Sequence, residues 1–358
     1  MSQAPIDPEA LKAYAKLVFG ALGGAMTSAM IYLGDRMGLY RALAGAGPTT
    51  SQELATRTGL DERWVREWLH QQGAAGVLAY RGAGRFELSA EGALVLAEES
   101  HPANGIGFFS QLPQMLAIAE KLPASFQTGV GLPYDAMGPE GARGIERGLA
   151  PWFRALLVPF ALPRVPGVVA RLEQGALVAD VGCGAGVALL EMAAAFPQSH
   201  FHGYDISQHA LARAEANRQE RGVANARFHD AIVDPLPDDG RFALVTTFDC
   251  LHDMTDPAGM MKRIRAALRD DGTWFVADIK AQPSYEQNVA KNPMAPMMYG
   301  TSVLTCMSSA LSEPGGAGLG TLGLHAELAR KLAEAAGFSR FEPLDLGHPV
   351  NAFYVVRP

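Results

Sequence analysis

A short apolar run followed by three closely spaced glycines is the most chemically informative part of this 358-residue sequence. Residues 176–181 suit a buried parallel strand, and Gly182, Gly184 and Gly186 follow at every second position. Such glycines let the backbone turn tightly and approach a ligand closely. Val187 leaves the dinucleotide pattern G-x-G-x-x-G incomplete. We therefore expect a nucleoside ligand that is not a dinucleotide.

Asp180, which stands two residues before the first of these glycines, indicates the charge of that ligand. Its carboxylate would repel a diphosphate, whereas it would attract the amino and sulfonium cations of S-adenosylmethionine (SAM). The loop and the acid together predict SAM as the cofactor.

Two further acids end the next two predicted strands. Asp205 is placed to accept both ribose hydroxyls of a nucleoside, and Ile206 beside it to pack on the adenine face. Asp230, followed by Ala231, is placed to accept from the adenine amino group. Three acidic strand ends in this order support SAM binding, with an adenosine-binding fold of different chemistry as the alternative.

The nine residues F-D-C-L-H-D-M-T-D at positions 248–256 carry a family resemblance. With the loop and acids, they make residues 165–358 resemble a class I SAM-dependent methyltransferase. The whole chain resembles the dimeric small-molecule O-methyltransferases of the caffeate and hydroxyindole type and their actinobacterial relatives. Those enzymes carry a similar His-Asp-Trp-Ser-Asp run, whose Trp is replaced here by Met254. The resemblance implies a seven-stranded Rossmann-like domain, a homodimer and a small-molecule methyl acceptor.

The resemblance also implies methylation of a hydroxyl, with His252 as the general base. Methyl transfer from a sulfonium is an in-line displacement, and a hydroxyl acceptor must lose its proton. A neutral imidazole suits that role near pH 7. Asp278, in the predicted strand 272–279, is expected to orient the imidazole. Phe248 and Asp249 are expected to contact the cofactor, Asp249 at its methionine end.

Departures from the family pattern leave alternatives open. The family has a glutamate where Asp278 stands, and a second one where this chain has Gly323 and then His325. C-methylation of an enolisable acid, or N-methylation, is therefore an alternative reaction. A metal held by His252 and His325 is another, but two His without a second nearby carboxylate are a poor metal signature. We expect no metal.

A methionine-rich insertion at residues 281–320 is expected to wall the acceptor pocket. Flexible thioethers adapt to varied apolar surfaces, which favours a small apolar acceptor with a phenolic or enolic hydroxyl. An ordinary hydrophobic core is the alternative. The predicted substrate-binding residues are Met294, Met298, Tyr299, Met307 and His325.

The N-terminal region predicts a mainly helical winged-helix domain used for dimerisation. Residues 8–43 are expected to be helical, and their many small residues favour close packing against another subunit. Two further helices and a two-stranded wing follow. The second of these helices, 61–72, carries Arg63 and Arg66 together with three acids, so DNA binding is not expected. A SAM-sensing DNA-binding regulator is the alternative from another functional class.

The composition is typical of a soluble globular protein. The chain is 48% hydrophobic and 19% charged, and its net charge of −7 disfavours a nucleic-acid partner. We see neither a signal peptide nor a run of about 18 uninterrupted apolar residues, so no membrane span is expected. Three widely spaced cysteines fit a reducing, cytoplasmic location. The predicted segments are the winged-helix domain, 1–100, a helical linker and substrate lid, 101–164, and the methyltransferase domain, 165–358.

Overall fold

The structure, a computed structural model, describes residues 6–358. It divides into two compact units, residues 1–112 and 113–358, which we describe separately. The predicted division into segments 1–100, 101–164 and 165–358 stays a prediction.

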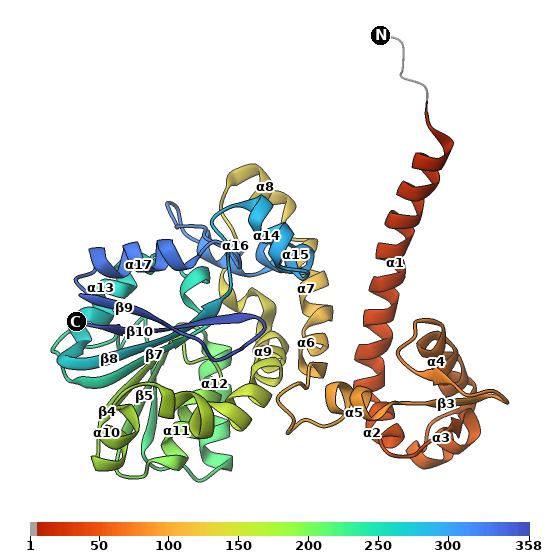
Figure 1. Ribbon diagram of the computed structural model, residues 1–358, viewed down its shortest axis with the longest axis horizontal. Helices are drawn as coiled ribbons and strands as arrows, with labels where there is room; N and C mark the ends of the chain where they lie inside the picture. Colours follow the sequence, from red (N-terminus) through yellow and green to blue (C-terminus); the bar gives the residue numbers. More distant parts are fainter. Residues whose placement is uncertain (1–5) are drawn as a thin grey trace. The chain divides into compact units, whose positions relative to one another are not determined.

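The first unit contains the predicted winged helix-turn-helix (Figure 1). Its helices are α1 (Pro8–Arg36), α2 (Leu39–Leu43), α3 (Ser51–Thr58), α4 (Glu62–Ala74), α5 (Ala90–Leu96) and α6 (Ile106–Ser110). Strands β1 (Thr49–Thr50), β2 (Ala79–Tyr80) and β3 (Arg85–Glu87) form a sheet in the order β1-β3-β2. Trp68 of α4 packs edge-on against Tyr40, and its indole N–H donates to the Met30 carbonyl at 2.9 Å. These contacts attach the end of α1 to the winged-helix core.

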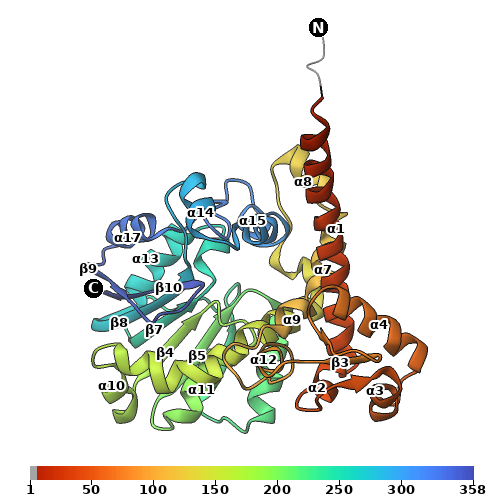
Figure 2. The same ribbon diagram turned by 45° about the vertical axis from the view of Figure 1, so that its right-hand side comes forward.

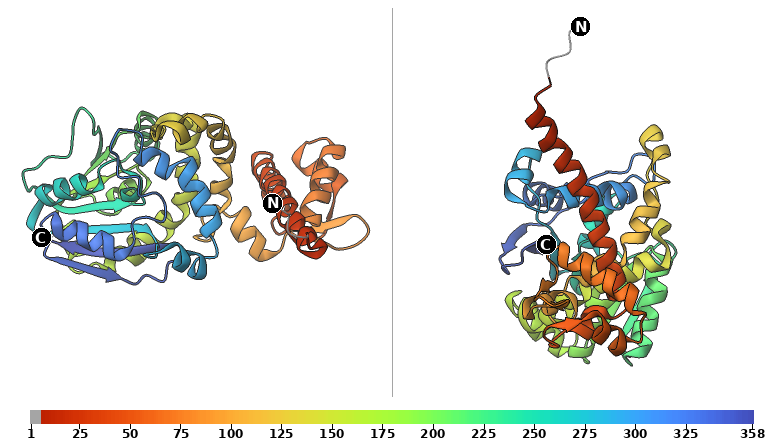
Figure 3. Two further views of the ribbon diagram at one scale, coloured as in Figure 1. Left: turned by 90° about the horizontal axis from the view of Figure 1, so that it is seen from above. Right: turned by 90° about the vertical axis from the view of Figure 1, so that its right-hand side faces the viewer.

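The N-terminal part of α1 extends past the other helices of its own unit (Figures 1 and 3). It exposes Leu11, Tyr14, Leu17, Val18, Phe19, Leu22 and Met26. By length and composition alone α1 passes the test for a membrane span, as does a pair of segments, Tyr134–Arg164 and Val168–Gln174, bent by 106°. The expectation of no membrane span missed these candidates because it required an uninterrupted apolar run. Helices of soluble proteins pass the same test, so the finding does not by itself predict a membrane protein.

The second unit is built on a seven-stranded sheet in the order β6-β5-β4-β7-β8-β10-β9. Its strands are β4 (Leu177–Val181), β5 (His200–Asp205), β6 (Ala226–Asp230), β7 (Phe242–Phe248), β8 (Leu268–Ile279), β9 (Arg340–Leu344) and β10 (Asn351–Arg357). The first five in this order are parallel, and β10 runs antiparallel to both of its neighbours. The predicted Rossmann-like fold is thus confirmed. Strand order reverses between β4 and β7, where ligands bind beyond the carboxyl ends of such sheets.

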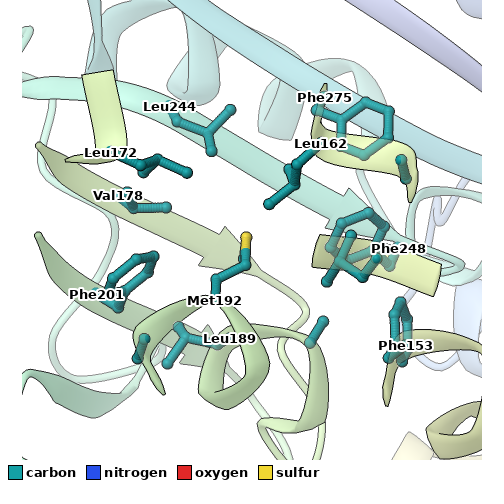
Figure 4. Packing of buried hydrophobic residues seen from close by; sticks show 14 of the residues in the cluster. Phe153, Leu162, Leu172, Val178, Leu189, Met192, Phe201, Leu244, Phe248 and Phe275 are labelled. Carbon is teal, nitrogen blue, oxygen red and sulfur yellow. The ribbon is translucent and has the colours of Figure 1, made fainter. Parts of the chain in front are cut away.

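Helices cover both faces of this sheet (Figures 1 and 2). One face carries α10 (Val168–Gln174), α11 (Val187–Ala195) and α12 (Gln208–Glu220), and the other carries α13 (Pro257–Ala267) and α17 (Ala326–Ala335). Buried side chains of α11 pack on the strands, with Leu189 and Met192 close to Phe201 and Val178 (Figure 4). Burial of both faces explains why the parallel strands are near-continuous apolar runs.

The remaining elements of this unit precede the sheet or lie between its strands. They are α7 (Leu112–Ala119), α8 (Pro123–Thr128), η1 (Tyr134–Met137), α9 (Gly138–Trp152), η2 (Phe153–Ala161), η3 (Leu162–Arg164), η4 (Leu251–Asp253), α14 (Tyr285–Lys291), α15 (Ala295–Leu304) and α16 (Cys306–Ala310). The segment η2 is π-helical and contains Pro159, and Pro151 lies in the last turn of α9. Proline lacks a backbone N–H and so interrupts regular α-helical hydrogen bonding at both places.

Candidate active site

The glycine loop after β4 has the left-handed backbone that its sequence suggested. Gly182 and Gly184 have φ values of 70° and 54°. A Cβ at Gly182 would lie 2.6 Å from Cβ of Cys250, so the protein itself excludes a side chain there. A Cβ at Gly184 would meet no atom within 4 Å. The space beside Gly184 is therefore open to a ligand.

A cavity of about 630 Å³ lies at the carboxyl ends of the parallel strands. Eight of the predicted cofactor residues line it: Asp180, Gly182, Gly184, Asp205, Ile206, Ala231, Phe248 and Asp249. Gly186 and Asp230 do not. A Cβ at Gly186 would meet the Phe228 ring at 2.5 Å, and the Asp230 carboxylate accepts a 2.7 Å hydrogen bond from the Gln208 amide. The volume is in the usual range for a small-molecule site.

The cavity wall is strongly acidic. Among the described residues that line it, eight carry carboxylates and only Arg263 carries a basic side chain. Burial raises the pKa of Asp180 to about 7, although a 2.7 Å hydrogen bond from Thr246 favours its charged form. Burial likewise raises the pKa of Asp249 and of Asp253 to about 7. Burial thus outweighs the nearby His252, which lowers the pKa of Asp249 and of Asp253, and a positively charged ligand would further stabilise the ionised forms.

Asp205 is held rigidly at the end of β5. One carboxylate oxygen accepts from the Gly184 N–H at 2.7 Å, and the other accepts from the Ser207 N–H at 2.8 Å. Burial raises the pKa of Asp205, and these backbone donors partly oppose that shift. A carboxylate oxygen can accept more than one hydrogen bond, so each oxygen keeps a lone pair for a ligand hydroxyl.

Asp249 is held in an unusual backbone conformation just after β7. Its φ of 53° lies in the left-handed region, which Asp tolerates better than most residues. Its N–H donates to the Ala277 carbonyl at 2.9 Å, and the Asn351 amide donates to its carboxylate. These bonds from two neighbouring strands keep the side chain at the cavity wall.

His252 and Asp278 form a buried pair beside the cavity. Nδ1 of His252 lies 2.5 Å from Oδ1 of Asp278, and the two residues are only 3% and 2% exposed. Burial opposes a charged imidazole, but the Asp278 carboxylate outweighs it and raises the pKa of His252 well above its ordinary value. Neither residue lines the cavity, whereas Asp253, the neighbour of His252, does.

The five predicted substrate-binding residues do not line this cavity. Met298 is buried in a small apolar cluster, against which Met294 and Tyr299 pack. His325 is the N-cap of α17, where its Nδ1 accepts from the Leu328 N–H at 3.3 Å. Met307 belongs to α16. A role for these residues in acceptor binding stays a prediction.

Sequence reasoning missed several residues that build the cavity from α9 and η1. Asp135 accepts hydrogen bonds from the Ser207 hydroxyl and from the Gln208 N–H, which joins η1 to the end of β5. Glu146 accepts from Asn217 at 2.9 Å, and the same amide donates to the Ala185 carbonyl of the glycine loop at 3.0 Å. No local motif marks these residues, because their partners are about 70 positions away in the chain.

Comparisons with known proteins agree with this architecture. Residues 172–337 match the family described as a methyltransferase domain, and residues 25–98 match the Rv2258c-like winged HTH domain. These matches confirm the predicted methyltransferase domain and the predicted winged-helix domain.

Individual relatives match only part of this chain or at low identity. A 115-residue segment is 32% identical to polyketide synthase ThaQ of Burkholderia thailandensis, covering 31% of this chain and 5% of that protein. A 108-residue segment is 30% identical to the ubiquinone biosynthesis O-methyltransferase of Marinobacter nauticus, covering 29% of this chain and 44% of that protein. The matches span less than half of either relative. Human N-acetylserotonin methyltransferase, solved in complex with SAM, has the same fold, with a TM-score of 0.68 at 17% identity over 100% of this chain and 99% of that chain.

We predict that Asp205→Ala weakens SAM binding by about 1–3 kcal/mol, because two ligand hydroxyls lose a charged acceptor. Isothermal titration calorimetry measures this directly. The exposed Asp238→Ala variant removes one negative charge outside the cavity and is expected to bind SAM as the wild type does. Equal affinities of the Asp205 variant and the wild type would remove the end of β5 from the cofactor site.

We also predict that SAM binding strengthens as the pH rises from 6 to 8. A cation binds preferentially to ionised carboxylates, whereas Asp180 and Asp249, with pKa values of about 7, are partly protonated at the acidic end of this range. Binding near pH 6.5 should therefore release protons, detectable as a dependence of the calorimetric heat on the buffer's ionisation enthalpy. Each group that must ionise contributes up to about tenfold in affinity per pH unit. A pH-independent affinity without proton release would contradict this assignment of charge.

Proposed function

We propose that this chain, which joins an Rv2258c-like winged HTH domain to a methyltransferase domain, transfers a methyl group from SAM to a hydroxyl of a small apolar molecule. The observation that carries this proposal is the acidic cavity beyond the glycine loop. It offers carboxylates at three adjacent strand ends and open space beside Gly184. A nucleoside with a cationic tail satisfies both features.

The residues present fit SAM. Asp205 would hold the ribose hydroxyls, and Ile206 and Ala231 would contact the adenine. Asp180 and Asp249 would face the cationic methionine end. When bound, SAM supplies a methyl group on a positively charged sulfur.

His252 is proposed to accept the proton of the acceptor hydroxyl at Nε2. Its Nδ1 faces Asp278, which fixes the orientation of the ring and stabilises the imidazolium that forms. In the free protein the raised pKa of His252 favours the protonated ring, which cannot act as a base. Occupation of the neighbouring acidic cavity by a cation disfavours that second positive charge, so cofactor binding prepares the base.

Oxygen is favoured over carbon or nitrogen as the methylated atom. The Marinobacter nauticus relative is named an O-methyltransferase, and a histidine–carboxylate pair suits removal of a hydroxyl proton. A phenolic or enolic acceptor would need least assistance, because its conjugate base is already stabilised. The cytoplasm is the proposed location.

Use of the winged helix as a DNA reader is not favoured by the charges on α4. Arg63 lies 2.6 Å from Glu67, and Arg66 pairs with Glu62 one turn earlier. DNA affinity depends on basic groups that neutralise phosphates, and both arginines of this helix already face carboxylates. We propose that this domain supports dimerisation instead.

A homodimer explains the exposed apolar face of α1. We predict that deleting residues 1–25 converts a dimer into a monomer, as measured by light scattering coupled to gel filtration, because the face that a second copy would cover is lost. The deletion keeps the Thr27 hydroxyl that accepts from Gln71 and the Met30 carbonyl that accepts from Trp68, so the winged helix should remain folded. A clean dimer after truncation would place the interface elsewhere.

We predict that His252→Ala leaves SAM affinity nearly intact but lowers turnover by about 10²–10⁴, the usual contribution of a positioned general base. In the wild type, kcat/KM should rise with pH as the imidazole deprotonates, with an inflection above its ordinary pKa of about 6.5. Asp278→Asn should move that inflection to lower pH, because the carboxylate that raises the pKa is gone. Full activity in His252→Ala would leave positioning alone as the catalytic device.

A further inference from the structure

Three side chains of different chemistry converge beside the cavity, and one of them, Asp253, lines it. His252 and Asp253 lie on η4, and Cys306 begins α16. A ring nitrogen of His252, a carboxylate oxygen of Asp253 and Sγ of Cys306 all lie within 4.8 Å of one another. The backbone of His252 is held by the Gly320 N–H, which donates to its carbonyl at 3.1 Å. We call His252, Asp253 and Cys306 the η4–α16 trio.

The surroundings of His252 resemble those of metal-binding histidines. Its Nδ1 faces Oδ1 of Asp278 at 2.5 Å, which leaves Nε2 to bind another group. Histidines that bind metals usually donate their other ring N–H to such a carboxylate. The second oxygen of Asp278 is buried without a hydrogen-bond partner among the described residues, so the carboxylate keeps charge that a nearby cation would offset.

We propose that the η4–α16 trio binds a borderline-soft divalent cation of the zinc type, through His252 Nε2, the Asp253 carboxylate and the Cys306 thiolate. Imidazole, carboxylate and thiolate are the ligands that Zn²⁺ takes in proteins, and three of them leave one coordination position for water. Asp253 also lines the cavity, so the open position faces the ligand space. Binding displaces to solvent the thiol proton of Cys306 and, from a protonated ring, the Nε2 proton of His252, while the cation exchanges water ligands for these side chains.

Such an ion would act as a reversible inhibitor. The metal and the acceptor's proton would compete for the same lone pair, that of His252 Nε2. This consequence rests on the proposed role of His252 as the base, whereas the metal site itself does not. The Cys306 thiol has no part in the proposed methyl transfer, so metal binding through it would add a form of regulation that the reaction itself does not require.

The test measures metal binding to the full-length protein in the absence of any acceptor. After treatment with a chelator, the protein is titrated with Zn²⁺ against a chromophoric chelator and, separately, with Co²⁺ in an absorbance spectrometer. We expect one Zn²⁺ per chain, and a thiolate-to-Co²⁺ charge-transfer band with tetrahedral ligand-field bands. Cys306→Ser should abolish the charge-transfer band and weaken Zn²⁺ binding by at least about tenfold. Asp253→Asn should weaken Zn²⁺ binding similarly, and Asp278→Asn by about 10–100-fold through the orientation of His252.

Cys250→Ser is the matched control for metal binding. The Cys250 thiol is also near the loop but donates to the Val181 carbonyl at 3.2 Å and is outside the trio. This variant should keep both the Zn²⁺ affinity and the Co²⁺ band, and a thermal melt of each variant verifies folding. Absence of Zn²⁺ binding by the wild type, or equal binding by the wild type and Cys306→Ser, would overturn the site. If the metal binds as expected but His252→Ala keeps full methyl transfer, the base assignment fails while the metal site stands.

Discussion

Unbalanced negative charge beyond the carboxyl ends of the parallel strands is the constraint on which the rest of the site depends. Asp180, Asp205, Asp249 and Asp253 lie in one partly desolvated cavity, with Arg263 as the one basic side chain among its described lining residues. Burial raises the pKa values of these carboxylates, neighbouring carboxylates add to the shift, and the ionised forms destabilise the free protein. A cation in the cavity would relieve this repulsion and stabilise the ionised carboxylates. The electrostatic destabilisation of the free protein would therefore contribute to the affinity for a cationic ligand.

Uncharged hydrogen-bond donors from the surrounding structure hold three of these carboxylates in position. Thr246 on the neighbouring strand donates to Asp180, the glycine loop donates to Asp205, and Asn351 donates to Asp249. None of these donors carries a full positive charge, so they orient the acids without neutralising them. The field that a ligand meets is therefore preorganised and negative.

His252 connects this cavity to the proposed chemistry and to the proposed metal site. Oδ1 of Asp278 lies 2.5 Å from its Nδ1, and Asp253 and Cys306 each have a possible ligand atom within 4.8 Å of a ring nitrogen. A base and a metal ligand need the same arrangement, a neutral imidazole whose second nitrogen is fixed by a carboxylate. The buried His252–Asp278 pair thus supports both proposals. They differ only in whether the lone pair of His252 Nε2 accepts a proton or binds a metal ion.

The sequence by itself determined the parallel strands and the acids at their ends. A strand buried on both faces needs a continuous apolar run, and a tight turn beside a ligand needs glycine, so both are visible over a few adjacent residues. The predicted strand at 272–279 begins earlier, at Leu268, because pairing with β7 extends the ladder into residues of little strand character. The fold class and eight residues that line the cavity could therefore be predicted from the sequence.

Only the tertiary structure decided which distant residues complete the site. Asp135 and Glu146 line the cavity and accept hydrogen bonds from residues about 70 positions away in the chain. Cys306 lies near His252 although their residue numbers differ by 54. It also placed Gly186 and Asp230 outside the cavity and packed Met298 into a small core of its own. Backbone conformation and strand burial are local and leave periodic patterns, whereas side-chain convergence depends on how separate elements pack, which leaves no pattern along the chain.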